Sequence, residues 1–223
     1  MSSYFTKKCT DFLKDLTKNN NREWFNEHKE QFKEFVEKPF HAFIEELINQ
    51  LREMDPKIQI TSKEAVFRIY KDIRFSKDKT PYKEYMAALI SKHGRKDHST
   101  PGMYLELRQD GIQIYTGVYE PTKEQLTNIR YFIADHLNEF NKLLQQKPFI
   151  KRYGSIQGEK NKLIPADLKE AASKQALIYN KHFYCSCKLE KAWITSDKLI
   201  KELINCYKDA KAVNQFFEQA IQA

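Results

Sequence analysis

The amino-acid sequence predicts an α+β protein with N-terminal helices, a central mostly antiparallel sheet that contains a hairpin, and C-terminal helices packed on that sheet. Apolar residues near both ends of the chain recur at helical spacing, whereas those between about residues 65 and 119 alternate as in strands. The expected strands follow one another with no helix between them. This order favours an antiparallel or mixed sheet over a doubly wound one.

Three helices are expected in the first fifty or so residues. The first has apolar residues at i, i+4, i+7, i+8 and i+11 counted from Phe5, and residues 19–21, all asparagine, end it and offer N-caps to the next helix. The second carries the apolar residues between Trp24 and Val36 on one face. Pro39 suits the first turn of the third helix, which residues 55–56 end.

Strands are expected in the middle of the chain. Residues 65–70 alternate as one strand, and residues 84–90 form a plausible second one. Residues 103–108 and 112–119 flank Asp110-Gly111, which is a strong hairpin signal.

Helices return after the hairpin. Residues 121–144 predict one long helix, residues 149–165 an irregular connection, residues 177–189 a further strand, and residues from 196 onward a final amphipathic helix. The sequence has no internal repeat, linker or low-complexity tract, so we expect residues 1–223 to form a single domain.

Composition and charge limit the classes of function expected for this chain. The chain has no apolar run near the roughly 20 residues that span a bilayer, and its first residues do not resemble a signal peptide. We therefore expect a cytoplasmic protein without a membrane partner. The net charge of +8 is compatible with nucleic acid, phosphate-bearing ligands or acidic partners, and does not choose among them.

No metal or cofactor is expected. His182, Cys185 and Cys187 have a spacing that resembles half of a zinc site, but a closed site needs four ligands and no second pair is present. We expect these thiols to be reduced and metal-free. The sequence also lacks a phosphate-binding glycine loop, a nucleophile elbow, a zinc-protease motif and a dinucleotide fingerprint.

Residues 68–83, which we call the basic loop, hold half of the excess positive charge. The segment carries six basic and two acidic side chains, a net charge of +4: Arg68, Lys71, Arg74, Lys77, Lys79 and Lys83 against Asp72 and Asp78. If residues 65–70 form a strand, Arg68 shares a face with Val66 and Tyr70 and points inward. A buried guanidinium needs a carboxylate or an anionic ligand, so we expect Arg68 and at least one of Asp72 and Asp78 to be buried and paired.

The basic loop is the candidate ligand-binding site. Arg74 can hold a carboxylate or phosphate through two parallel hydrogen bonds, Lys79 adds a mobile ammonium group, and Tyr82 adds a flat wall. Ser76 contributes a hydroxyl, and Asp72 would orient Arg74. The predicted ligand-binding residues are Arg68, Asp72, Arg74, Ser76, Lys79 and Tyr82; no catalytic residue is assigned.

Three functions stay open on this evidence. The first is a pocket, with or without catalysis, for a small molecule that carries a phosphate or carboxylate. The second is a nucleic-acid-binding module in which Tyr82 and Tyr85 stack on bases. The third is a protein-interaction module, in which pairs between arginine or lysine and aspartate merely hold the loop together. Acids alternating with guanidinium groups favour the first, because a nucleic-acid surface would be more uniformly basic.

Three sequence motifs resemble the bacterial and fungal family catalogued as domain of unknown function 2461. The motifs are Asn19-Asn20-x-x-x-Trp24-Phe25, the stretch Arg68-Ile69-Tyr70-x-Asp72-x-Arg74-Phe75-Ser76-x-Asp78-Lys79-Thr80-Pro81-Tyr82-Lys83, and Gly117-x-Tyr119-x-Pro121. The resemblance covers nearly the whole chain, and the long irregular middle motif makes it specific. It implies a single domain of about this length and no catalytic assignment, because the activity of the family is unknown.

Overall fold

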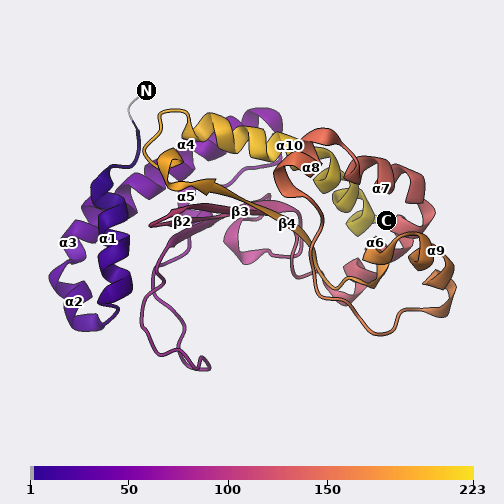
Figure 1. Cartoon of the computed structure of the whole chain (residues 1–223), viewed down its shortest axis with the longest axis horizontal. Coiled ribbons are helices and arrows are strands. Elements are labelled where there is room, and N and C mark those ends of the chain that lie inside the picture. The colour runs from indigo at the N-terminus through magenta and orange to yellow at the C-terminus, as the bar shows by residue number, and fades with distance from the viewer. Residues whose placement is uncertain (1–2) are drawn as a thin grey trace. The chain divides into compact units, whose positions relative to one another are not determined.

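A computed structural model describes residues 3–223 and confirms the α+β fold (Figure 1). The described chain contains a four-stranded antiparallel sheet with the strand order β1-β2-β3-β4. The strands are β1 (Met86–Ile90), β2 (Gly102–Arg108), β3 (Gly111–Val118) and β4 (Phe183–Glu190). The predicted hairpin is confirmed as β2 and β3, which Gln109 and Asp110 connect.

Helices make up most of the remaining regular structure. The α-helices are α1 (Lys7–Lys18), α2 (Arg22–Glu27), α3 (Lys29–Phe32), α4 (Lys38–Met54), α5 (Ser62–Ala65), α6 (Lys123–Asp135), α7 (Leu137–Leu144), α8 (Lys147–Tyr153), α9 (Lys169–Lys174) and α10 (Leu199–Gln222). A π-helical turn, η1 (Lys33–Glu37), and the 3-10 turns η2 (Gly94–Lys96), η3 (Ala166–Leu168), η4 (Ala176–Tyr179) and η5 (Lys191–Trp193) complete the set. None of the helices in residues 3–223 combines the length and the apolar character of a membrane span.

The chain divides into two compact units. The first contains the chain up to residue 95 together with residues 104–114 and 188–204; the second contains residues 96–103, 115–187 and 205–223. Strands β2, β3 and β4 and helix α10 each have residues in both units. The expectation of a single domain stays a prediction.

The N-terminal helices follow the predicted stripes with one difference. The helix expected to span Trp24 to Val36 is interrupted at His28, after which α3, η1 and α4 run on without a break to Met54. Pro39 lies in the first turn of α4, as predicted. Because proline lacks an N–H group and its ring crowds the carbonyl four residues earlier, the turn just before it takes the wider π-helical form.

Two C-terminal predictions were wrong in detail. The single helix expected over residues 121–144 is split at His136, whose ring stacks on Phe132 at 4.1 Å and whose Nδ1 lies 2.9 Å from the Phe132 carbonyl oxygen. The Phe132 carbonyl oxygen also accepts the His136 N–H at 3.0 Å, so the backbone and the side chain of His136 share one acceptor where the helix is interrupted. The connection expected over residues 149–165 starts as helix α8, and its later part pairs with the β4 region through bridges at Gln157 and Lys160.

The strand expected over residues 65–70 is also wrong. Ala65 ends helix α5, and the residues after it pair with the β1 region only through the bridges Val66–Ala88 and Tyr70–Tyr82. Between these bridges, the first segment has three residues, 67–69, and the segment that pairs with it has five, 83–87. The extra residues form a bulge that interrupts the ladder, so regular strand geometry begins only at Met86.

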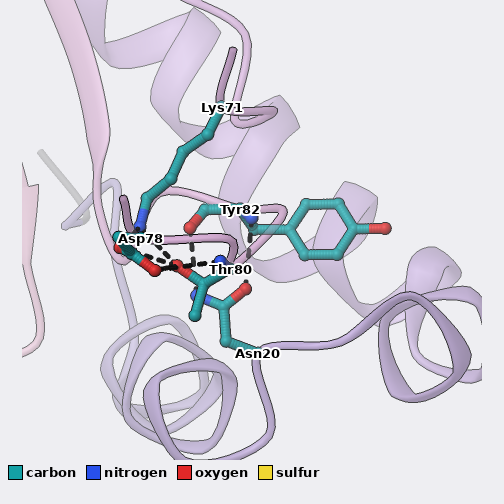
Figure 2. A network of polar contacts seen from close by, with 5 residues as sticks. All are labelled: Asn20, Lys71, Asp78, Thr80 and Tyr82. Carbon is teal, nitrogen blue, oxygen red and sulfur yellow. Dashed lines mark hydrogen bonds and ion pairs between the residues drawn. The ribbon is translucent and has the colours of Figure 1, made fainter. Parts of the chain in front are cut away.

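The side chain of Asn20 joins the connection between α1 and α2 to Tyr82, through the two backbone hydrogen bonds that a neighbouring strand would make. The Asn20 amide donates to the Tyr82 carbonyl oxygen at 3.0 Å, and the Tyr82 N–H donates to Asn20 Oδ1 at 3.1 Å (Figure 2). The neighbouring Asn21 caps α2 by accepting a hydrogen bond from the Trp24 N–H. The asparagine run therefore ends one helix, starts the next and holds a residue 62 positions away.

Asn20→Ala should lower the free energy of unfolding by about 2 kcal/mol, because it removes two hydrogen bonds and leaves the backbone groups of Tyr82 unpaired. Urea denaturation measures this change. Asn19→Ala is the matched control: its carboxamide makes one exposed local hydrogen bond to Asp15, and its loss should cost less than about 0.5 kcal/mol. Equal losses for the two variants would contradict the role given to Asn20.

Candidate functional site

Arg68 does not occupy the buried position predicted for it. Its side chain is exposed, and within residues 3–223 no hydrogen bond or ion pair joins it to another residue. The alternation fails because this segment is not a regular strand. Its buried residues are Ala65, Val66 and Ile69, which do not alternate. The predicted burial of Asp72 or Asp78 is wrong as well, since both are exposed.

Asp72 is nevertheless paired, with Arg74. The guanidinium donates through Nε to Oδ1 at 2.9 Å and through its terminal nitrogen to Oδ2 at 2.6 Å, so both fork positions are used. These hydrogen bonds lower the pKa of Asp72 to about 2. The Arg74 side chain stays 76% exposed, so the pair lies on the outer surface of the basic loop.

A second network closes the basic loop at its base. Lys71 Nζ donates to Asp78 Oδ2 at 2.8 Å and to Thr80 Oγ1 at 2.6 Å, and the Thr80 N–H donates to Asp78 Oδ1 at 2.9 Å (Figure 2). The Lys71 hydrogen bond is the main reason that the pKa of Asp78 falls below its usual value. Lys79 Nζ donates to the Ile73 carbonyl oxygen at 3.0 Å. Much of the charge of the loop is therefore used to hold the loop itself.

A pocket of about 300 Å³ lies beside this network. Its lining comes from helix α2 and from both ends of the basic loop: Arg22, Asn26, Tyr70, Lys71, Ile73, Pro81 and Tyr82. Of the six predicted ligand-binding residues, Tyr82 lines this pocket. Arg68, Asp72, Arg74, Ser76 and Lys79 are not part of its lining.

Tyr82 is the residue that builds the pocket wall. It is 3% exposed, and its ring stacks on Phe25 with 4.0 Å between centroids and lies 5.3 Å from the Tyr70 ring. The phenol ring points away from the Lys71–Asp78–Thr80 network (Figure 2). Burial raises the pKa of the Tyr82 hydroxyl, while the charge of Arg22 acts in the opposite direction. The hydroxyl is thus protonated at neutral pH and can donate a hydrogen bond.

Four polar groups in the lining have no partner within the described chain. The Arg22 guanidinium, the Asn26 carboxamide and the hydroxyls of Tyr70 and Tyr82 make no hydrogen bond or ion pair with another described residue. Arg22 and Asn26 are four positions apart on α2, which places them on the same face of the helix. Together these groups present donors around one concavity, and a ligand with acceptor atoms would satisfy them.

The sequence reasoning missed Arg22 and Asn26. Their i, i+4 spacing directly after the Asn21 cap is a signal that they share a helix face, but nothing local indicates that this face meets Tyr70 and Tyr82. It also missed a buried carboxylate on β2, Glu106, which alternates with core residues and carries its own arginine partner.

Comparison with protein families gives a match over most of the chain. A family model described as "Conserved hypothetical protein (DUF2461)" matches residues 8–216, a span that contains all three motifs noted in the sequence. A search of curated proteins finds no match to the chain.

Arg74→Gln should raise the pKa of Asp72 from about 2 toward the usual value near 3.9, and should leave Asp78 unchanged. Pairing depresses the pKa of both carboxyl groups in the folded protein. The stabilisation of the loop by these pairs is therefore fully present above the pKa values of the unfolded chain, and it is lost as the pH falls through the pKa values of the folded protein. A ¹³C NMR titration of the carboxyl groups measures both values. An ordinary pKa for Asp72 in the wild type would contradict the geometry described.

Proposed function

Because the chain belongs to the DUF2461 family, described only as conserved hypothetical proteins, we propose a function from its own residues. The protein binds an anionic small molecule, one that carries a carboxylate or phosphate, in the pocket lined by Arg22, Tyr70 and Tyr82. The observation that carries this proposal is the Arg22 guanidinium beside two phenol groups, none of which makes a hydrogen bond or ion pair within residues 3–223.

Arg22 is better suited to an incoming anion than Arg74. A guanidinium recognises carboxylate and phosphate through two parallel hydrogen bonds from its fork. In Arg74 the fork is filled by Asp72, so a ligand there would have to displace a carboxylate held at 2.6 and 2.9 Å. No carboxylate of the described residues is paired with Arg22, which replaces Arg74 as the main anchor.

The pocket also suits a small ligand with a flat or apolar part. Its volume of about 300 Å³ lies at the lower end of the range typical of small-molecule sites. The rings of Tyr70 and Tyr82, with Ile73 and Pro81, supply apolar walls. Since Tyr82 is fixed by Asn20 and Phe25, little side-chain freedom would be lost on binding.

The other residues predicted to bind the ligand have indirect roles in this proposal. Asp72 orients Arg74, and Arg68, Ser76 and Lys79 add polar and positively charged groups outside the pocket lining. Their contribution is the long-range attraction of an anion rather than direct contact. The cytoplasmic location, and the absence of a metal or cofactor, stay predictions.

Nucleic acid is the second candidate, and one observation favours it. The Phe75 side chain is 95% exposed on the basic loop, and the Arg74 guanidinium lies 5.8 Å from its ring centre. An exposed aromatic ring beside cations is a surface on which an unpaired base can stack. Binding of this kind would weaken strongly as salt rises.

The test is a binding screen of monocarboxylates, dicarboxylates, sugar phosphates and nucleotides by calorimetry. Any ligand found should bind Arg22→Gln roughly ten- to a hundredfold more weakly than wild type, because a charge-assisted hydrogen-bond pair is lost. Arg74→Gln is the matched control, and it should change the affinity little.

Three results would contradict the proposal. A ligand that binds Arg22→Gln as well as wild type would exclude this pocket. A ligand whose binding is abolished in Arg74→Gln but not in Arg22→Gln would place the site on the outer surface of the basic loop instead. Salt-sensitive binding of single-stranded oligonucleotides that disappears in Phe75→Ala would favour the nucleic-acid function instead.

A further inference from the structure

A second group of interacting side chains lies in the first compact unit, on the face of β2 opposite its core residues. Met103, Leu105 and Leu107 are buried, whereas Tyr104, Glu106 and Arg108 alternate with them. Glu106 is itself buried: it accepts hydrogen bonds from Arg108 at 2.6 and 2.9 Å and from the Tyr104 hydroxyl at 3.1 Å. Both carboxylate oxygens are therefore engaged.

Lys83 borders this group. Its backbone N–H donates to the Ile69 carbonyl oxygen at 2.8 Å, within the bulge between the Tyr70–Tyr82 and Val66–Ala88 bridges. A bulge re-aims side chains relative to a regular strand. The half-buried Lys83 ammonium lies 5.1 Å from the centre of the Phe67 ring, and it makes no hydrogen bond or ion pair with another described residue.

We propose that Lys83 is a nucleophilic amine that forms an imine with an aldehyde or ketone, and that Arg68 binds an anionic group of the same molecule. The site lies outside the lining of the pocket assigned above, so this inference goes beyond the proposed anion binding.

The surroundings of Lys83 make its ammonium form less favourable than that of a lysine in water. Burial lowers the pKa of the Lys83 ammonium, the positive charge of Arg68 lowers it further, and Glu106 opposes both effects. Glu106 cannot act as a full counter-ion, because Arg108 and Tyr104 already engage its two oxygens. A lysine that is desolvated and next to another cation is the arrangement that activates an amine for covalent catalysis.

Arg68 is placed to hold the anionic end of a substrate. Its guanidinium is exposed and makes no hydrogen bond or ion pair with another described residue, and its charge acts on both Lys83 and Asp72. It directly precedes Ile69, to which the Lys83 backbone is bonded. A carboxylate or phosphate on Arg68 would bring a nearby carbonyl group of the same molecule to the amine, which raises its effective concentration.

The covalent step balances without an added oxidant or reductant. The deprotonated Nζ of Lys83 attacks the carbonyl carbon, a C–N bond forms, and the carbonyl electron pair moves to oxygen. Proton transfer from nitrogen to that oxygen gives a carbinolamine. Loss of water then gives the imine, so one amine and one carbonyl yield one imine and one water.

Reductive labelling of the full-length protein tests the proposal. Wild type is incubated at neutral pH with para-carboxybenzaldehyde and cyanoborohydride, which adds hydride to an imine, and the modified lysines are identified by peptide mass spectrometry. Lys83 should be labelled severalfold faster than Lys77, an exposed lysine of the same loop. Labelling of Lys83 no faster than Lys77 would overturn the proposal, and this comparison needs no variant.

Arg68→Gln separates anion binding from amine reactivity. The variant should slow the labelling of Lys83 by para-carboxybenzaldehyde more than the labelling by benzaldehyde, which has no carboxylate, while Lys77 reacts unchanged. Equal slowing with both aldehydes, or none, would overturn the role of Arg68. Because the variant removes an exposed side chain that makes no hydrogen bond or ion pair with a described residue, folding should be preserved, and circular dichroism verifies this.

Discussion

The packing of Tyr82 against Phe25, with the two hydrogen bonds between Asn20 and the Tyr82 backbone, is the contact on which the candidate site depends. Phe25 belongs to α2, the helix that also carries Arg22 and Asn26. Tyr82 closes the basic loop, because its bridge to Tyr70 brings the two ends of that loop together. One aromatic stack therefore joins the two walls of the pocket, and it fixes the donors of α2 opposite the phenol groups of the loop.

The charge of the basic loop is distributed between holding the loop and attracting a ligand. Lys71 is used on Asp78 and Thr80, Arg74 on Asp72, and Lys79 on a backbone carbonyl. These exposed pairs contribute little to global stability, since water and salt screen them. Their effect is local order in a segment without helix or regular strand (Figure 1). The cationic groups of Arg22, Arg68 and Lys83 make no hydrogen bond or ion pair with another described residue, and these are the positions to which we assign chemistry.

Local patterns predicted local structure well. The stripe that starts at Phe5 became α1, and Asp110-Gly111 became the hairpin, because periodicity and turn chemistry are set by neighbours in sequence. The Asp72–Arg74 pairing was foreseeable for the same reason. The burial of Arg68 was wrong because a bulge between distant bridges removed the strand register on which it depended. Arg22 and Glu106 were missed because their importance comes from tertiary neighbours that spacing does not indicate.

Native-state hydrogen exchange of the Tyr82 amide tests most directly whether the pocket walls form one cooperative unit. If Tyr82 joins the two pocket walls, its N–H, which is hydrogen-bonded to Asn20, should exchange with the same opening free energy as two other amides. These are the Lys83 N–H, which is bonded to the Ile69 carbonyl oxygen, and the N–H of the buried Leu16 in α1. Exchange of the Tyr82 amide as fast as that of the exposed Phe75 would contradict this account, because the loop would then open independently of α2.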